Sequence, residues 1–163
     1  MTQIITAAEL KEQSLVDINV LDFYCDQAIK ISQEVNLCKL IGESLYDAII
    51  AKIDGNTLAG KYKTLVDDYI KDYLYLDSTA EIQIPLAFKN RNMGVVRTTD
   101  PEVESVELKD IAYIKKYYSD RADFYAQKIV NYIRKNSADF PEFHTEDCNG
   151  IKPQDSSFRL NIF

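Results

Sequence analysis

The chain has 163 residues and a formal net charge of −7, from 19 basic and 26 acidic residues. This length suits one domain with a core of its own. The acidic balance argues against a surface whose main task is to hold nucleic-acid phosphates, because such binding needs clustered Lys and Arg. DNA passing nearby is not excluded, since an acidic wall repels DNA and lets it slide without sticking.

Cysteine usage and hydropathy bear on where the protein works. Cys25, Cys38 and Cys148 are an odd number without close spacing, which is typical of reduced thiols in a cytosolic setting. No apolar run approaches the roughly 20 residues that span a bilayer. The N-terminus also lacks the basic region and apolar core of a secretory signal, so we expect a protein made in the cytoplasm and acting without a membrane.

The first part of the chain has the period of amphipathic helices. Thr6 and Glu9 have the spacing of a capping box, which predicts a short helix over about 7–13. A longer helix should follow a cap at Asp17 or Asn19, because apolar residues then recur every three or four positions. The recurring positions are Leu21, Tyr24 or Cys25, Ala28, Ile31, Val35 and Cys38.

Two further helices are expected after this one. Gly42 should interrupt the pattern, which resumes over 43–53 and ends at a turn over 54–56. Another stripe predicts a helix over about 59–76, with a weaker helical piece from 78 towards 88 that a proline limits. The members of this stripe are Leu58, Tyr62, Leu65, Tyr69, Tyr73 and Leu76, supported by Val66 and Ile70.

The helical period then vanishes and returns. Residues 89–106 lack it, and their Asn-Met-Gly-Val-Val-Arg sequence at 92–97 predicts a loop or short β-hairpin. The clearest helix should cover about 108–135. Its apolar positions are Ile111, Ile114, Tyr118, Ala122, Tyr125, Ile129 and Ile133. We therefore predict a mainly α protein, in which residues 1–136 form a bundle of about four to five helices with the hairpin or loop inserted at about 89–106.

Residues 137–163 cannot continue the last helix. Two prolines, a glycine and several Asp, Asn and Ser residues break its period, yet the apolar side chains are too many for a disordered tail. We expect an extended C-terminal arm that lies on its own helices or on a neighbouring subunit. The alternation of Phe158, Leu160 and Ile162 suits adding a strand to a neighbour's edge.

Candidate chemistry is sparse and lies at the start of this arm. Glu142, His144 and Cys148 are metal-competent, but a zinc site usually takes ligands in spaced pairs, and the sequence has one His and no second pair. No phosphate-binding glycine motif or nucleophile motif accompanies them. We therefore expect no catalytic residue, no metal, no cofactor and no enzymatic activity.

Eleven tyrosines and no tryptophan are present, and all eleven tyrosines fall in expected helices. Most belong to the core stripes. Five lie off or beside them, where an amphipathic ring suits a contact with a partner. These are Tyr24, Tyr75, Tyr113, Tyr117 and Tyr132.

An ordered series of short segments extends over most of the chain. They are the Thr-x-x-Glu-Leu-Lys cap at 6–11, Leu-Ile-Gly-Glu-Ser-Leu-Tyr-Asp at 40–47, Tyr-Lys-Thr-Leu-Val at 62–66, Asn-Met-Gly-Val-Val-Arg at 92–97, Ala-Asp-Phe-Tyr at 122–125, Tyr-Ile-Arg-Lys-Asn at 132–136 and Phe-Pro-Glu at 140–142. In this order they resemble the head-tail connector proteins of tailed bacteriophages, also called adaptor, head-completion or neck ring proteins, including ring proteins of crAss-like phages.

The resemblance implies a structural virion protein of the neck, made in the host cytoplasm. It would form an oligomeric ring, commonly of twelve subunits, beneath the portal, contacting the portal and other neck or tail proteins and joining capsid to tail. DNA would pass through the channel without specific binding. Interface anchors would lie in the hairpin and the arm, at Met93, Val95, Val96, Arg97, Phe140, Phe143, Phe158, Leu160, Ile162 and Phe163. The alternative is a small non-enzymatic regulatory or adaptor module that binds a protein partner through its helices.

Overall fold

The computed structural model describes residues 2–91, 94–97 and 108–144 of the chain. Within them the fold is a helical bundle, which confirms the predicted mainly α class. The helices in chain order are α1 (Ala7–Gln13), α2 (Asp22–Ile31), α3 (Cys38–Ile41), α4 (Glu43–Asp54), α5 (Gly60–Leu65), α6 (Lys71–Ala87) and α7 (Leu108–Lys135).

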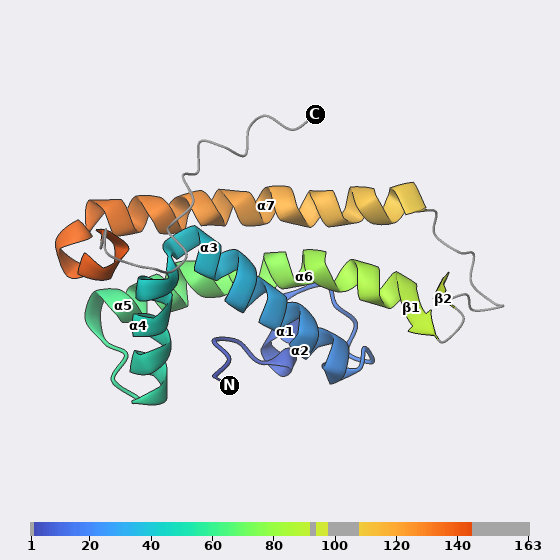
Figure 1. The fold of residues 1–163 in the computed structure, drawn as a ribbon, viewed down its shortest axis with the longest axis horizontal. Coiled ribbons are helices and arrows are strands. Elements are labelled where there is room, and N and C mark those ends of the chain that lie inside the picture. The colour runs from blue at the N-terminus through green and yellow to red at the C-terminus, as the bar shows by residue number, and fades with distance from the viewer. Residues whose placement is uncertain (1, 92–93, 98–107, 145–163) are drawn as a thin grey trace.

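The centre of the bundle is the antiparallel pair α6 and α7, which lie side by side along the length of the molecule (Figure 1). Helices α1 and α2 pack against α6 on the opposite side from α7, so α6 is the middle layer. The short helices α4 and α5 close one end of the pair (Figure 1). Among the described residues, none of the helices is both long enough and apolar enough to cross a membrane.

A β-hairpin follows α6 at the other end. Strand β1 (Phe88–Arg91) pairs antiparallel with β2 (Gly94–Arg97), with Phe88 opposite Arg97 and Arg91 opposite Gly94. The hairpin agrees with the prediction for this region, whose remaining residues lie outside the described part.

The first helix begins as the capping box predicts. The backbone N–H of Glu9 donates to the Thr6 hydroxyl at 3.2 Å, and the N–H of Thr6 donates to the Glu9 carboxylate at 2.7 Å. Two of the amides that a helix start leaves unbonded are thus satisfied. The observed bounds, Ala7–Gln13, match the predicted range.

The predicted cap of the second helix is wrong. Helix α2 starts at Asp22, and its N-cap Leu21 makes no side-chain hydrogen bond. Asp17 is instead used inside the preceding loop, where its carboxylate accepts the N–H of Asn19 at 2.7 Å. Because this local bond turns the chain before the helix begins, Leu21 stays outside the core and is exposed.

A π-helical turn, η1 (Ser32–Leu37), changes which residues of the second helix are buried. A π turn takes one residue more than an α turn, so the positions that follow are rotated relative to a regular helix. Val35, expected on the apolar face, is exposed, whereas Leu37 is buried. Ile31 is exposed before the turn begins, because α2 buries Cys25, Ala28 and Ile29 instead. The prediction failed here because it assumed one unbroken period of 3.6 residues.

Gln33 has a structural role near the start of this turn. Its side-chain carbonyl accepts the N–H of Ile4 at 2.8 Å, and its amide donates to the carbonyl of Thr2 at 2.9 Å and to the Tyr46 hydroxyl at 3.1 Å. A buried amide costs free energy unless its groups are paired, and here both ends are. The N-terminal segment is therefore tied to the inside of the bundle.

Gly42 ends α3 and starts α4, as predicted. Its φ of 82° and ψ of 151° belong to a region that is open essentially to glycine alone. The chain reverses its course here without a cap side chain. This single residue therefore sets the angle between the two helices.

A second π turn, η2 (Val66–Ile70), joins α5 to α6, so one continuous helical run extends to Ala87. The separate helical piece expected after residue 78 is the end of this same run. Its polar residues are accommodated inside the helix, where the Thr79 hydroxyl donates to the carbonyl of Tyr75 at 2.6 Å. Pro85 falls inside the last turn, and the helix continues past it to Ala87.

The start of the arm folds back on the bundle. Two short 3₁₀ turns, η3 (Ser137–Asp139) and η4 (Pro141–His144), follow α7, and η4 packs against α4. Phe140, between them, has an exposed fraction of 0% and is among the largest fully buried side chains. The bundle and the first residues of the arm therefore share one core.

Candidate functional site

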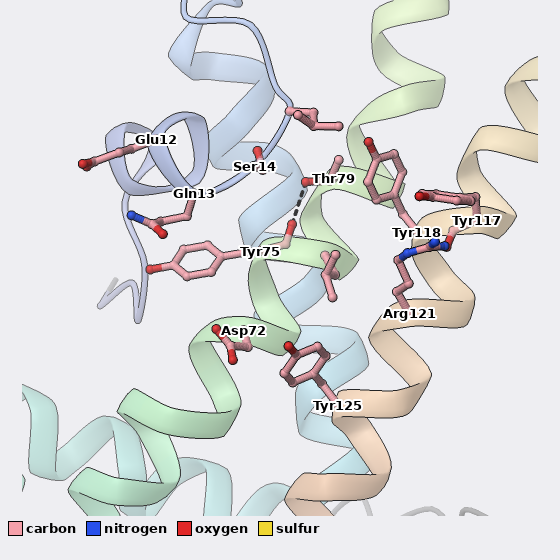
Figure 2. A pocket seen from close by; sticks show the side chains of 12 residues that line it. Glu12, Gln13, Ser14, Asp72, Tyr75, Thr79, Tyr117, Tyr118, Arg121 and Tyr125 are labelled. Carbon is pink, nitrogen blue, oxygen red and sulfur yellow. Dashed lines mark hydrogen bonds between the residues drawn. The ribbon is translucent and has the colours of Figure 1, made fainter.

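A groove of about 430 Å³ lies over the middle layer of the bundle, between the end of α1 and the middle of α7 (Figure 2). One tyrosine from α6 and three from α7 line it, and α6 lies between the α1 and α7 sides. The residues that line it are Glu12, Gln13, Ser14, Leu15, Asp72, Tyr75, Leu76, Thr79, Tyr117, Tyr118, Arg121 and Tyr125.

The α7 wall is held by Arg121. Its guanidinium carbon lies 3.3 Å from the centroid of the Tyr117 ring, and its Nη1 donates to the carbonyl of Tyr117 at 3.0 Å. The Tyr117 ring in turn meets Tyr118 edge to face, with ring centroids 5.3 Å apart. A planar cation stacked on a ring has little freedom left to lose, so this wall is prepared for a contact.

The acidic groups of the groove come from α1 and α6. Glu12 of α1 and Asp72 of α6 line it, and burial raises the pKa of the Asp72 carboxyl, against the opposing effect of Lys128. Burial also raises the pKa of the Tyr75 phenol, which the neighbouring carboxylates reinforce. Among the described residues, three or more His, Cys, Asp or Glu side chains do not gather anywhere in a geometry that could hold a metal ion. The groove therefore offers aromatic ring faces, a cation at Arg121 and carboxyl groups at Glu12 and Asp72. This combination suits a segment of another protein.

An aromatic stripe continues from the groove along the outward face of α7. We use this name for Tyr113, Tyr117 and Phe124, which recur at helical spacing and are all exposed. The Nζ of Lys128 lies 4.7 Å from the centroid of the Phe124 ring. The sequence of α7 carries seven Lys or Arg residues and three Asp residues, so this helix is basic within an acidic chain.

A second exposed apolar surface lies where α1 connects to α2. We call it the loop patch, and its members are Leu15, Ile18, Leu21 and Phe23. Leu15 and Ile18 have exposed fractions of 85% and 80%, the highest among the large apolar residues that the structure describes. Lys11 of α1 fixes the loop through two contacts. Its Nζ donates to the carbonyl of Ile18 at 3.2 Å and forms an ion pair with Asp22 at 2.5 Å. An ordered loop and helix start that together display four large apolar side chains are typical of an interaction site.

Residues 37–153 match the model of a family of unknown function, DUF6712. The chain belongs to this family. The match takes in the α6 and α7 walls of the groove and the start of the arm, and it begins after α1 and α2. No curated protein and no solved structure matches this DUF6712 protein.

Three of the four interface residues that the sequence predicted in the hairpin lie in the part of the chain that the structure describes. Val95, Val96 and Arg97 lie on β2, where the backbone of Val95 pairs with Asn90 and that of Val96 with Lys89. Met93 lies outside the described residues. The hairpin sits at the far end of α6 from the short helices α4 and α5 (Figure 1).

Phe140 and Phe143 were expected to contact another subunit. For Phe140 this expectation is wrong, because its side chain is fully buried in its own chain. Its ring meets Tyr62 at 4.9 Å and Tyr132 at 6.1 Å between centroids. A side chain buried in this way presents no surface to a partner. Phe143 is partly buried against the same core.

The other predicted anchors, Phe158, Leu160, Ile162 and Phe163, lie outside the described residues of this DUF6712 protein, as does Cys148. Glu142 binds its own chain, accepting a hydrogen bond from the Tyr62 hydroxyl at 2.7 Å. His144 ends η4.

Of the five tyrosines predicted beside the core stripes, two are well exposed, and two, Tyr75 and Tyr117, line the groove. Tyr113 and Tyr117 belong to the aromatic stripe, and Tyr75 lies in the groove wall. Tyr24 and Tyr132 are instead partly buried against the core.

Sequence reasoning missed most of the residues that form these surfaces. Tyr118 and Tyr125 were assigned to the core stripe of α7; Tyr125 does pack against the core, and both also line the groove. Leu21 was assigned to the buried face of α2. A signal for the loop patch was present, since Leu15 and Ile18 lie among turn-forming residues that no helix could bury.

Proposed function

We propose that this DUF6712 protein is a structural subunit of an oligomeric ring in the head-tail connector of a tailed bacteriophage, beneath the portal. The observation that carries the proposal is the exposure of two large apolar surfaces, the loop patch and the aromatic stripe, on one small folded chain. Apolar patches of this kind on a monomer mark contacts with other proteins. The order of sequence segments that resembles connector proteins supplies the context.

Several properties support an assembly role. The two surfaces lie on elements that the core holds rigidly, because α7 packs along the whole of α6 and Lys11 fixes the loop. A rigid surface loses little conformational entropy on binding. The net charge of −7 also suits a channel through which DNA slides, since like charges repel.

The proposal places the protein in the virion, made in the host cytoplasm, with the portal and other neck or tail proteins as partners. A ring of twelve subunits is the stoichiometry that the resemblance implies. DNA would pass through the ring without specific contacts. The arm beyond residue 144 would reach the portal, a neighbouring subunit or the next ring.

The test is assembly in the presence of the portal protein from the same genome. The purified chain would be mixed with portal particles, and the mixture measured by size-exclusion chromatography with light scattering and by electron microscopy. We expect a portal particle that gains a ring of this chain at one end. Portal particles that emerge unchanged at micromolar excess of the chain would reject the proposal.

The alternative, a regulatory or adaptor module that binds another protein through its helices, is favoured by the tyrosine-lined groove. It predicts a complex of one chain with one partner and no ring. The same light-scattering measurement separates the two, because a ring subunit adds many copies to a portal particle, whereas an adaptor adds none. Portal and capsid genes beside the gene for this chain would favour the ring.

A further inference from the structure

We propose that the aromatic stripe of one copy binds the loop patch of a second copy, head to tail. This inference rests on the proposed function and names the partner that its exposed surfaces would take. It commits to one occupant for both surfaces, a second copy of the chain. The argument rests on charge, position and shape.

Charge complementarity favours this pairing. The loop patch carries exposed Asp17 and Asp22 among its apolar residues, with Lys11 as the nearby cation. The aromatic stripe carries Arg121 over Tyr117 and Lys128 over Phe124. Two stripes facing each other, or two loop patches, would bring like charges together, which costs free energy and disfavours that arrangement.

The chemistry of the apolar groups also differs between the two surfaces. The stripe presents flat rings, while the loop presents the branched side chains of Leu15, Ile18 and Leu21 beside one ring, Phe23. Aliphatic knobs against aromatic faces pack closely, and aromatic residues with Arg are the types enriched in contact centres. Each surface therefore has its complement on the other.

The two surfaces are distinct but meet at the groove, which Leu15 of the loop patch and Tyr117 of the stripe both line. The start of α2 lies across α6 from α7 (Figure 1). Two distinct complementary surfaces on one subunit generate a head-to-tail contact, in which every copy uses both. Such contacts close into a ring or continue as a filament, whereas a two-fold dimer needs one self-complementary surface.

The test uses two variants, each of which carries a new charge on one of the two surfaces. Ile18→Glu adds a charge to the loop patch, and Tyr113→Glu adds one to the stripe; the exposed fractions of 80% and 71% mean that neither change disturbs the core. Lys63→Glu, at an exposed position of α5, is the matched control for a new acidic side chain. Self-association would be measured by sedimentation equilibrium at low salt, up to millimolar chain, with circular dichroism to check folding.

The expected result is specific to a head-to-tail contact. Each variant alone should associate at least about tenfold more weakly than the parent, because a charge is placed at the centre of the contact. A mixture of the two variants should form dimers and no larger species. The intact stripe of Ile18→Glu binds the intact loop patch of Tyr113→Glu, and the two substituted surfaces that remain bind no further copy. Lys63→Glu should behave like the parent.

A parent chain that stays monomeric at millimolar concentration would overturn the inference, as would a mixture that forms no dimers. Portal binding distinguishes this failure from that of the proposed function. If the ring forms on the portal and Ile18→Glu and Tyr113→Glu join it normally, the pairing is wrong and the connector role stands. If the variants behave as expected in isolation but the parent ignores the portal, the pairing stands and the connector role fails.

Discussion

The hydroxyl of Tyr62 donates a 2.7 Å hydrogen bond to the carboxylate of Glu142, joining α5 to the start of the arm across 80 residues of sequence. The Tyr62 ring also packs against Phe140. This contact fixes the first turn of the arm to the bundle. The direction in which the rest of the chain leaves therefore depends on it.

Tyr62→Phe removes this hydrogen bond while keeping the ring. We expect it to lower the free energy of unfolding by about 1 kcal/mol, because a bond to a carboxylate is worth more than a neutral one but the site is partly open to solvent. Urea unfolding measures the change. Tyr132→Phe is the control, since the Tyr132 hydroxyl is buried without a hydrogen-bond partner among the described residues, so a similar loss there would contradict the assignment.

Phe140→Ala should be far more costly. The side chain is fully buried between Tyr62 and Tyr132, and truncating a buried Phe typically costs about 3–5 kcal/mol through lost burial and the cavity that remains. Phe124→Ala, on the exposed face of α7, should change stability by less than about 0.5 kcal/mol. Equal effects at the two positions in a thermal melt would show that Phe140 is not part of the core.

Stability should fall at alkaline pH. Burial raises the pKa of Tyr62 well above its usual value, with help from Glu142, and burial likewise raises the pKa of Tyr46 and Cys25. The folded state therefore holds protons that the unfolded chain releases, so the stabilisation is complete below about pH 8.5 and is lost as pH rises through the folded pKa values. Melting temperatures from pH 7 to 11 should decrease above pH 9, and Tyr62→Phe should make the decrease shallower above pH 10. A flat profile would refute this coupling.

Removing residues 156–163 should leave the bundle folded. The described core ends at η4, so far-ultraviolet circular dichroism and the melting temperature should match those of the full chain. We expect ring formation on the portal to weaken, because the removed segment carries Phe158, Leu160, Ile162 and Phe163. Undiminished assembly of the shortened chain would exclude these four residues as anchors.

The elements that the sequence predicts best are those with a local cause. The capping box at Thr6 fixes the start of α1, and the long apolar period of α7 gives its observed bounds. Gly42 is predictable for the same reason, since a glycine between two apolar stripes marks a break. Each of these signals acts over a few residues and needs no partner.

The features that sequence reasoning missed depend on tertiary packing. Nothing in Ser32–Leu37 announces a π turn, which is stabilised by what Gln33 binds on two other segments. The groove is assembled from three helices distant in sequence, so Tyr118 and Tyr125 could not be separated from the core stripe by spacing alone. Phe140 was assigned to an interface because a lone Phe beside a proline gives no hint of which surface covers it.

The two π turns have a consequence for comparing members of this family. Each absorbs one residue that, added to a regular α-helix, would rotate everything that follows it by about 100° around the helix axis. A relative that lacked one residue within Ser32–Leu37 would run as a regular α-helix through this stretch and would still turn the residue aligned with Leu37 inward. A one-residue gap in an alignment of this family should therefore be placed inside a π turn, where it leaves the buried faces before and after it in register.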